Sequence, residues 1–481
     1  MFDEILKNAP DTEPARQEFF IGEASKLLLQ QTGTGKDHPS CYIATFGCQM
    51  NFRDSEKLLG ILNAIGFKSA EREEDADLIL MNTCTVRDNA NQRIFGRLGV
   101  LKGYKKTNPA LRIAMCGCMM QEPSVIEKIR KSYPYVDLIF GTHNIYRLAE
   151  YLTQVLAEGK PVIAIEDRAT QVVEDLPVIR KYPYKSGVNI MYGCDNFCSY
   201  CIVPYVRGRE HSREPEEILE EIRKLASDGV REVMLLGQNV NSYGKNCREE
   251  ISFSELLHRV EAIDGIDRIR FMTSHPKDLS DELIAVMRDS KKICRHLHLP
   301  LQSGSSRILK LMNRHYDKEQ YIDLALKIRE SIPDISISTD IIIGFPTETK
   351  EDVDETLDVI RRVRFDNAFT FLYSKRTGTP AASMEGQVDA AFAGEQFDRV
   401  LQLVQETAKE QAEKWTGRET EVLVEEINEQ DPHLVTGRMS NNLLVHFPGD
   451  KSDIGKILNV ALTECRGFYF IGERVTKGGT K

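Results

Sequence analysis

Three cysteines stand close enough together in the sequence to hold one metal centre. The stretch YGCDNFCSYCIVPYVRG places Cys194, Cys198 and Cys201 at the spacing C-x3-C-x2-C, and the next cysteine is Cys247. A structural zinc site closes with four ligands, commonly as two C-x2-4-C pairs, and bacterial ferredoxins use the run C-x2-C-x2-C-x3-C. Three thiolates on a four-iron cluster leave one iron open to a substrate. The spacing predicts such a cluster, with zinc or a catalytically inert cluster as the alternatives.

A second set of cysteines is spread along the chain. Cys48, Cys84 and Cys118 are separated by 36 and 34 residues and stand in the motifs GCQMNFRDSE, NTCTVR and GCMMQ. Each follows the end of an apolar run with the character of a strand. If one strand and one helix fill each interval, all three cysteines lie at the carboxyl edge of one parallel sheet, where such folds bind ligands. This predicts a second cluster with an open position, and the alternative is three unrelated, half-buried cysteines.

Cys116 competes with Cys118 for the third position of this second set. Strand alternation directs both side chains to the same side. Cys116 lies inside the apolar run RIAMC, however, whereas Cys118 comes after Gly117 in the loop. We therefore assign Cys118 to the set. For the other four cysteines a structural role is the expectation: Cys41, Cys247, Cys294 and Cys465.

The elements that position the second set lie in residues 39–180. Short apolar runs alternate there with helical periods, which predicts βαβ units and a doubly wound parallel sheet with helices on both faces. Residues 1–38 precede this domain as an N-terminal extension with two short amphipathic segments. Because ends of this kind are commonly poorly anchored, we expect the extension to be peripheral.

The alternation restarts in residues 181–415. Six strand candidates occur there, at residues 188–193, 231–237, 268–274, 295–300, 335–344 and 367–374. Six βα units fall short of the eight that close a full barrel, so the pattern predicts an α/β fold with a partial (βα)6 barrel. Cys194 follows the first strand directly, which places the first cysteine set at the carboxyl end of the barrel strands.

The end of the chain changes character. Residues 390–415 predict one long helix, and five short strands within residues 416–481 predict a small all-β barrel.

Length and composition agree with a soluble protein of several domains. At 481 residues the chain allows about three domains of ~150 residues each. No apolar run approaches the ~20 residues of a membrane span, and the opening MFDEILKNAP lacks the order of a secretory signal. We expect a cytoplasmic protein with no membrane partner. In that reducing compartment the 11 cysteines favour metal or redox chemistry over disulfides.

The first cysteine set resembles that of the radical S-adenosylmethionine superfamily. The hallmark of these enzymes is C-x3-C-x2-C with an aromatic residue before the third cysteine, which is Tyr200 here. The resemblance implies that the open iron binds the amine and carboxylate of S-adenosylmethionine. One electron from the cluster then splits the cofactor into methionine and a 5′-deoxyadenosyl radical.

The three motifs of the second set strongly resemble the methylthiotransferase family within that superfamily, and the match covers residues 41 to about 480. It implies two 4Fe–4S clusters, the auxiliary one on Cys48, Cys84 and Cys118. It also implies two molecules of S-adenosylmethionine per product, one that methylates a sulfur held on the auxiliary cluster and one that generates the radical. An electron donor such as a flavodoxin or ferredoxin would be needed. Residues 416–481 resemble the small TRAM-like barrel of RNA-modifying enzymes.

The motifs are most similar to the branch that modifies isopentenyladenosine, or N6-dimethylallyladenosine, beside the tRNA anticodon. Other branches act on an aspartate of a ribosomal protein or on threonylcarbamoyl-adenosine in tRNA. A different class, a non-catalytic iron–sulfur RNA-binding or sensor protein, is also compatible with the cysteines. An open iron that cleaves S-adenosylmethionine separates the enzyme from the sensor.

Two groups of cations are candidates for RNA contact. The first runs without an intervening acid, in a chain of net charge −10: Arg93, Arg97, Lys102, Lys105, Lys106 and Arg112. A solvated helix face is the alternative. The second group, Arg207, Arg209 and Arg213, follows the first cysteine set and could hold a substrate phosphate, a cofactor carboxylate or a salt bridge.

Several polar residues follow the predicted barrel strands, where a cofactor would lie. The family motifs imply that they contact S-adenosylmethionine, together with Tyr200: Gln238, Asn239, Ser274, Gln302 and Asp340.

Overall fold

The computed structural model describes residues 1–31, 38–85, 88–167, 173 and 176–475, so residues 32–37 of the predicted extension lie outside it. The chain divides into two compact units. The first contains Met1–Lys181, Tyr192–Cys194 and Ile202–Glu210, and the second contains Tyr182–Met191, Asp195–Cys201 and His211–Lys481. Two short segments from the middle of the chain therefore fold with the N-terminal part.

A six-stranded, all-parallel sheet forms the centre of the first unit, in the order β2-β1-β3-β4-β5-β6. Its strands are β1 (Ser40–Thr45), β2 (Lys68–Ser69), β3 (Leu78–Thr83), β4 (Arg112–Gly117), β5 (Leu138–Phe140) and β6 (Val162–Ala164). The helices of residues 1–181 are α1 (Phe2–Lys7), α2 (Ala15–Gln31), α3 (Gln49–Ile65), α4 (Asp88–Thr107), α5 (Pro123–Ser132) and α6 (Leu148–Glu158). Short 3-10 turns are η1 (Glu73–Asp75), η2 (Cys118–Gln121) and η3 (Ile145–Arg147).

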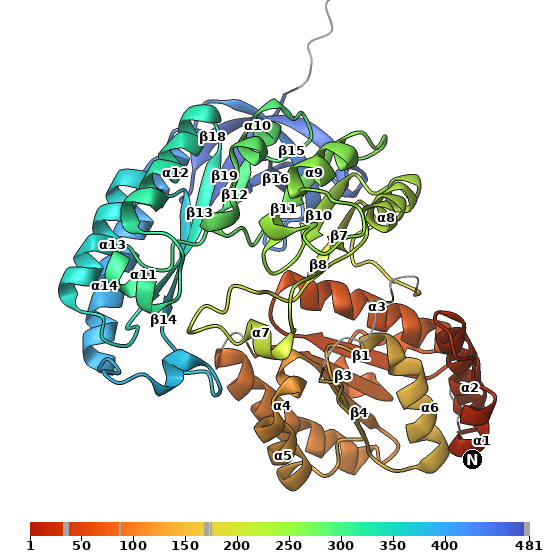
Figure 1. Cartoon of the computed structure of the whole chain (residues 1–481). Helices are drawn as coiled ribbons and strands as arrows, with labels where there is room; N and C mark the ends of the chain where they lie inside the picture. Colours follow the sequence, from red (N-terminus) through yellow and green to blue (C-terminus); the bar gives the residue numbers. More distant parts are fainter. Residues whose placement is uncertain (32–37, 86–87, 168–172, 174–175, 476–481) are drawn as a thin grey trace, which may run out of the picture. The chain divides into compact units, whose positions relative to one another are not determined.

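Helices cover both faces of this sheet, because successive side chains of a strand point to opposite sides (Figure 1). Leu78 and Leu80 of β3 pack with α3 and α6 in one core, and Ile79 and Met81 pack with α4 and α5 in the other. The central strands are buried on both faces, which is typical of parallel sheets. The predicted doubly wound domain is confirmed.

The N-terminal helix α2 belongs to the core of the first unit. Phe20 and Ala24 are fully buried, and the Thr153 hydroxyl of α6 donates a hydrogen bond to the Phe20 carbonyl oxygen at 3.3 Å. Arg16 forms an ion pair with Glu150, also on α6, at 2.9 Å. The expectation that residues 1–38 are peripheral is wrong for α2, because the apolar stripe of this helix covers α6.

Six parallel strands of the second unit form two three-stranded sheets, β11-β10-β7 and β12-β13-β14. They are β7 (Lys185–Asn189), β10 (Glu232–Leu236), β11 (Arg268–Phe271), β12 (His296–His298), β13 (Ser336–Ile343) and β14 (Asn367–Leu372). The helices around them are α8 (Pro215–Ser227), α9 (Phe253–Glu261), α10 (Asp281–Asp289), α11 (Ser306–Leu311), α12 (Lys318–Ser331), α13 (Lys350–Val363) and the long α14 (Ala390–Glu413). Turns η4 (Val240–Ser242), η5 (Pro276–Asp278) and η6 (Pro380–Ser383) complete this region. The predicted six-stranded partial barrel and the long helix are confirmed.

The first predicted barrel strand is divided in two. β7 ends at Asn189, and the next residues form β8 (Met191–Tyr192), which pairs with β9 (His211–Ser212). The short helix α7 (Val203–Val206) lies in the loop between β8 and β9. Cys194 therefore follows β8 rather than a continuous barrel strand.

Five strands close the C-terminal barrel in the order β15-β16-β17-β19-β18, as predicted. They are β15 (Glu419–Ile427), β16 (Leu434–Met439), β17 (Leu444–Pro448), β18 (Ile457–Cys465) and β19 (Tyr469–Arg474), with the turn η7 (Lys451–Asp453). Two buried arginines of β11 hold this barrel through its backbone. Arg268 donates to the carbonyl oxygens of Arg438 and Glu421 at 2.8 and 2.9 Å, and Arg270 donates to that of Met439 at 2.8 Å.

Within the described residues, no helix combines the length and the apolar composition that a membrane span requires.

Replacing Phe20 with alanine is expected to lower the free energy of unfolding of the first unit by about 3–5 kcal/mol, because it removes a fully buried ring. Hydrogen–deuterium exchange of the full chain should show faster amide exchange in α2 and α6. The single tryptophan, Trp415, belongs to the second unit, so the fluorescence transition should not move. Leu29→Ala, at a side chain of α2 that is 69% exposed, is the control. Equal exchange in both variants would contradict the assignment of α2 to the core.

Candidate metal centres

The second cysteine set lies at the carboxyl ends of three neighbouring strands. β1, β3 and β4 pair side by side, and Cys48, Cys84 and Cys118 each follow their strand by three residues or fewer. The Cys84 and Cys118 side chains are buried, and Cys48 is exposed. The parallel topology thus places the three cysteines at one edge of the sheet, although each is more than thirty residues from the next in the sequence. The sequence predicted this placement.

Two glycines permit this approach. A Cβ atom on Gly47, which has a φ of +106°, would lie 2.5 Å from Cys84 Cβ and 2.7 Å from Cys84 Sγ. Side chains larger than hydrogen are therefore excluded directly before the first cysteine of the set. Gly117, with a φ of +97°, turns the chain at the end of β4 so that Cys118 begins η2. A Cβ there would lie 2.3 Å from a backbone oxygen of β3.

The three thiols of this set influence one another electrostatically. Burial raises the pKa of Cys118 to about 11, the positive charge of Arg207 opposes this, and the neighbouring Cys48 and Cys84 raise the pKa further. Buried thiols of this kind ionise when a positive centre binds them. The donor set, three thiols that converge on one edge, fits an iron–sulfur cluster.

No His, Cys, Asp and Glu side chains of the described ranges form a group of three around a single metal ion. In a four-iron cluster each thiolate binds a different iron, so the ligands stand farther apart than those of one ion.

Cys116 and Cys118 have different surroundings. Cys116 is fully buried in the core between the sheet and helices α3 and α6, and burial raises its pKa well above the usual value. Cys118 instead packs against Ile202 and Val206, beside α7. The choice of Cys118 for the second set agrees with these positions.

A charged group, Arg207, contacts a cysteine of this set. Its Nε donates a hydrogen bond to Cys118 Sγ at 3.0 Å, and Nη2 donates to Asn51 Oδ1 at 2.8 Å and to Asp54 Oδ2 at 3.3 Å. Only 8% of the residue is exposed. A guanidinium in this position cannot reach an RNA phosphate, so we remove Arg207 from the predicted RNA-binding residues. Arg209, two residues later, is exposed.

The first cysteine set lies on the loop between β8 and β9. The Cys194 backbone N–H donates to the Gly208 carbonyl oxygen at 3.2 Å, within the first unit. In the second unit, the Cys201 N–H donates to the Cys198 carbonyl oxygen at 2.9 Å. The three cysteines lie within a stretch of eight residues.

A turn after α11 holds the part of this loop that belongs to the second unit. Asn313, in the left-handed region with φ +58°, donates its side-chain amide to the carbonyl oxygens of Asn196 and Phe197 at 3.2 and 3.0 Å. The Ser199 N–H donates to the Met312 carbonyl oxygen at 3.0 Å. These bonds fix the backbone on both sides of Cys198.

Arg314 continues this turn and was missed by sequence analysis. Its Nη1 donates to Cys198 Sγ at 3.4 Å, its Nη2 donates to the Pro300 carbonyl oxygen at 3.0 Å, and its Nε contacts the Tyr316 hydroxyl at 2.9 Å. The residue is buried. Its spacing in the stretch LMNRHY carries no signal for this contact, because the partner lies 116 residues earlier. In each cysteine set, a sulfur therefore receives a guanidinium hydrogen bond, Cys118 from Arg207 and Cys198 from Arg314.

Polar groups without partners lie at the carboxyl ends of the barrel strands. Asn239 follows β10 and Ser274 follows β11, and both are buried. Among the residues that the structure describes, Asn239 Oδ1 and Ser274 Oγ have no hydrogen-bond partner, whereas Asn239 Nδ2 donates to Asp278 at 2.7 Å. Buried polar atoms are rarely left unsatisfied, so these two atoms fit contact with a polar cofactor.

The remaining predicted cofactor residues lie in the same unit. Gln238 is half-buried beside Asn239, and Tyr200 packs with Phe345 in an apolar cluster. Gln302 has a φ of +72°, and its N–H donates to the Asp340 carbonyl oxygen at 2.8 Å. A left-handed conformation in a residue other than glycine is often found at ligand sites.

Asp340 on β13 has a histidine neighbour, His298 of β12. Its carboxylate lies 3.3 Å from His298 Nε2, and the other ring nitrogen of His298 lies 2.9 Å from Ser338 Oγ. The partner fixes the orientation of the Asp340 side chain.

Glu348 closes the turn that follows β13. Its Oε2 accepts a hydrogen bond from the Gly344 N–H at 2.5 Å, and only 4% of the residue is exposed. Burial raises the pKa of this carboxyl to about 8. The hydrogen bond supports the backbone beside Phe345, which packs against Tyr200.

The cation run of α4 and the start of β4 is compensated in part by acids that lie elsewhere in the sequence. Arg97 pairs with Glu73 of η1, and Lys105 and Arg112 both pair with Asp137. The run contains no acid in the sequence, but three of its cations receive counter-charges from acids of other segments. Arg93, Lys102 and Lys106 are exposed and have no ion pair within the described part of the chain.

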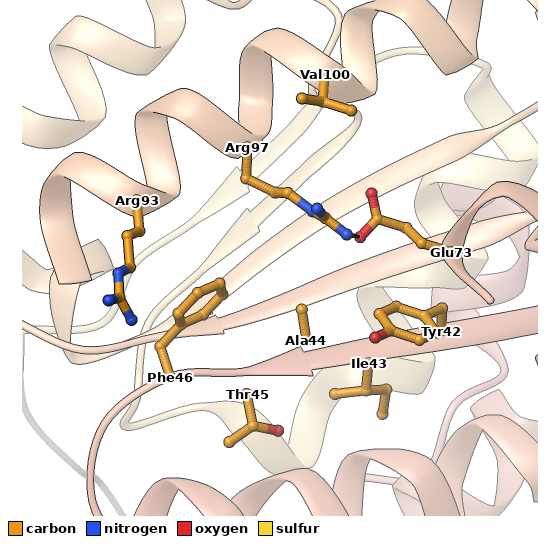
Figure 2. A pocket seen from close by; sticks show the side chains of 9 residues that line it. All are labelled: Tyr42, Ile43, Ala44, Thr45, Phe46, Glu73, Arg93, Arg97 and Val100. Carbon is orange, nitrogen blue, oxygen red and sulfur yellow. Dashed lines mark hydrogen bonds and ion pairs between the residues drawn. The ribbon is translucent and has the colours of Figure 1, made fainter. Parts of the chain in front are cut away.

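A groove of about 550 Å³ lies beside the free edge of β1. β2 pairs only with Ser40 and Cys41, so residues 42–45 of β1 have no strand on that side within the described ranges. Figure 2 shows Arg93 and Arg97 extending from α4 toward β1, with Arg97 meeting Glu73. The aromatic rings of Tyr42 and Phe46 also line the groove.

Three family models match the chain. The Radical SAM superfamily matches residues 188–360, the Uncharacterized protein family UPF0004 matches residues 40–141, and the TRAM domain matches residues 413–475. These ranges contain the first cysteine set, the second cysteine set and the C-terminal barrel, respectively.

Curated relatives match almost the whole chain. A protein of Lachnoclostridium phytofermentans named tRNA-2-methylthio-N(6)-dimethylallyladenosine synthase is 58% identical over 431 residues, which cover 90% of this chain and 94% of that protein. A protein of the same name from Acetivibrio thermocellus is 51% identical over 464 residues, 96% of each chain. Among solved structures, the radical S-adenosylmethionine methyltransferase TsrM from Kitasatospora setae has a TM-score of 0.52 and 14% identity, over 72% of this chain and 77% of that one. This likeness shows the fold alone.

The chain is expected to lose stability as the pH rises from about 5 to about 8, because the folded state keeps the Glu348 proton that the unfolded state releases. One such proton changes the free energy of unfolding by up to about 1.4 kcal/mol per pH unit. Glu348→Gln is uncharged at every pH, so its thermal midpoint should exceed that of the unchanged chain at pH 8 but not at pH 4. Calorimetry across this range measures the difference, with the exposed Glu351→Gln as control. Parallel pH curves for the chain and Glu348→Gln would refute the assignment.

Proposed function

Because this chain belongs to the family of the tRNA-2-methylthio-N(6)-dimethylallyladenosine synthases, the methylthiotransferases among the radical S-adenosylmethionine enzymes, we propose that it adds a methylthio group to N6-dimethylallyladenosine beside the tRNA anticodon. The observation that carries the proposal is the convergence of Cys48, Cys84 and Cys118 in a chain that also contains the radical S-adenosylmethionine motif. Replacing an aromatic C–H bond, which no acid or base of protein strength ionises usefully, with a carbon–sulfur bond needs both a radical source and a sulfur source.

Two sets of ligands divide this work. Cys194, Cys198 and Cys201 would hold a 4Fe–4S cluster that, with S-adenosylmethionine and one electron, supplies the radical that activates the adenine C–H bond. The second set would hold an auxiliary cluster that supplies sulfur. Two molecules of S-adenosylmethionine are consumed per product, one as methyl donor and one as radical source. An electron donor such as a flavodoxin or ferredoxin completes the system, in the cytoplasm.

The residues around the first set hold the cofactor and the loop in place. Arg314 and Asn313 keep the Cys198 loop in one conformation through hydrogen bonds to its sulfur and its backbone. Asn239 and Ser274 offer unsatisfied polar atoms to S-adenosylmethionine at the strand ends. Because Asp278 already holds the Asn239 side chain, little of its conformational entropy is lost when the cofactor binds.

The groove beside β1 is suited to RNA. Arg93 is exposed at its rim, and Phe46 and Tyr42 can stack with bases. Phe46 is two residues before Cys48, so an RNA strand in the groove would lead toward the second cysteine set. Lys102 and Lys106 lie one helical turn apart on another side of α4 and would contact phosphates there. Arg209 remains a further candidate.

Reconstitution with single cysteine variants tests the function. The anaerobically reconstituted chain is given tRNA that carries N6-dimethylallyladenosine, S-adenosylmethionine and dithionite, and nucleosides and 5′-deoxyadenosine are measured by mass spectrometry. Cys198→Ala should abolish 5′-deoxyadenosine. Cys84→Ala should retain its formation but yield no methylthio nucleoside, because the radical source is intact and the sulfur source is lost.

Cys465→Ala, outside both sets, is the control and should make product. If Cys84→Ala and Cys198→Ala gave the same pattern, the division of labour would be refuted. If the unchanged chain released 5′-deoxyadenosine but modified only a ribosomal-protein aspartate or threonylcarbamoyl-adenosine, the substrate assignment would be wrong. A chain that cleaves no S-adenosylmethionine would be a sensor instead.

Arg93→Ala is expected to weaken tRNA binding similarly for all sequences, because a phosphate contact carries no base information. The slope of log K against log salt concentration should become smaller by about 1, measured by filter binding at several salt concentrations. Lys131→Ala is the matched control, since this exposed lysine of α5 already pairs with Glu127. An equal loss in both variants would indicate a general charge effect and remove the groove from the RNA-binding surface.

A further inference from the structure

A buried arginine reaches the second cysteine set from the segment that follows the first. Arg207 stands six residues after Cys201, and its segment, Ile202–Glu210, folds with the first unit. Two apolar side chains of this segment also pack on Cys118. The segment that follows the ligands of the first cysteine set therefore surrounds Cys118, a ligand of the second set.

The guanidinium of Arg207 is held in a fixed orientation. Nη2 donates to Asn51 Oδ1 at 2.8 Å and to Asp54 Oδ2 at 3.3 Å, which leaves Nε directed at Cys118 Sγ at 3.0 Å. Asn51 is itself fixed, because its side-chain amide donates to the carbonyl oxygens of Phe46 and Thr83 at 2.8 and 2.9 Å. The carbonyl groups at the ends of β1 and β3 thus determine where the guanidinium points.

The charge of Arg207 requires an anionic environment. A buried guanidinium is costly unless opposite charge and hydrogen-bond acceptors surround it. Asp54 provides one carboxylate, and the side chains of both residues are almost fully buried. The hydrogen bond to Cys118 becomes charge-assisted once the thiol is an iron-bound thiolate. The site is therefore complementary to an anionic sulfur at Cys118 and not to a neutral thiol.

We propose that Arg207 is a positioning residue for the auxiliary cluster: it orients the Cys118 thiolate through Nε and raises the reduction potential of that cluster. The proposal rests on the proposed function, because it requires a cluster on the second set. A 4Fe–4S cluster in its 2+ state with three thiolates carries one net negative charge and gains a second on reduction. A nearby fixed positive charge and a hydrogen bond to sulfur stabilise the reduced state more than the oxidised state.

The relative potentials of the two clusters determine which of them accepts an electron first from a one-electron donor. Because Arg207 follows the first cysteine set in the same loop, that loop contributes to the difference between the two reduction potentials. Arg314, which donates to Cys198, belongs to the second unit and is not part of this proposal.

The test isolates the auxiliary cluster. In the full chain, Cys194, Cys198 and Cys201 are replaced by alanine, so that the second set alone can hold iron, and the protein is reconstituted anaerobically with iron and sulfide. The midpoint potential is measured by a redox titration with dithionite, followed by electron paramagnetic resonance. Relative to this parent, Arg207→Gln should shift the midpoint to a more negative value. Arg207→Lys keeps the charge but loses the planar donor, so its shift should have the same sign and be smaller.

Arg209→Gln is the matched control. It removes the same charge two residues away in the same segment, from an exposed side chain, and its midpoint should equal that of the parent. If Arg207→Gln left the midpoint unchanged, or if Arg209→Gln shifted it equally, the proposal would be overturned while the cluster itself would stand.

Iron analysis distinguishes the loss of the auxiliary cluster from a change in its potential. A parent that binds no iron would overturn the auxiliary cluster of the proposed function, and the present inference with it. If Arg207→Gln alone lost its iron, Arg207→Lys would decide: a midpoint below that of the parent supports the proposal, and a midpoint equal to that of the parent contradicts it.

Discussion

The parallel pairing of β1, β3 and β4 is the constraint on which the first unit depends. These strands are covered on both faces, so a shift of register by one residue would turn every buried side chain toward the wrong core. The strand ends are therefore fixed relative to one another, and so are the three cysteines that follow them. Gly47 permits Cys84 to lie close to the loop after β1, because a side chain at position 47 would clash with the Cys84 sulfur. A metal centre gains its geometry from a fold that exists for reasons of hydrophobic burial.

Both cysteine sets share a second feature, a buried guanidinium that donates to one sulfur. Arg207 donates to Cys118, and Arg314 donates to Cys198. Burial of an arginine is unfavourable in an apolar core, and each of these side chains is surrounded by acceptors that the backbone or a carboxylate supplies. A guanidinium hydrogen bond to sulfur is favourable when the sulfur carries negative charge, as an iron-bound thiolate does. Residues other than the cysteines, Arg207 and Arg314, are therefore also arranged for the chemistry of the two centres.

The second unit combines a rigid support with unsatisfied polar groups at its ligand side. Arg268 and Arg270 fasten the C-terminal barrel to β11 through backbone carbonyl groups, so this attachment tolerates changes in the barrel side chains. At the opposite ends of these strands, Asn239 and Ser274 keep buried polar atoms without partners in the described structure. The contacts with the C-terminal barrel therefore lie at one end of the strands, and the unsatisfied polar atoms lie at the other end.

The sequence by itself determined the architecture and the cysteines. Strand and helix periods reflect burial, which acts on each segment locally, so they predicted the doubly wound sheet, the partial barrel and the small β-barrel. The C-x3-C-x2-C spacing and the position of Cys48, Cys84 and Cys118 after strands are likewise properties of the chain. Ion pairs could not be predicted in this way, because the partner of a charged side chain can belong to any element that lies near it in space. Tertiary structure alone decided that Glu73 and Asp137 pair with three of the six cations in the run from Arg93 to Arg112, and that α2 is part of the core. It also decided that Arg207 lies beneath the surface against Cys118, 89 residues away in the sequence, where local spacing holds no information about the contact.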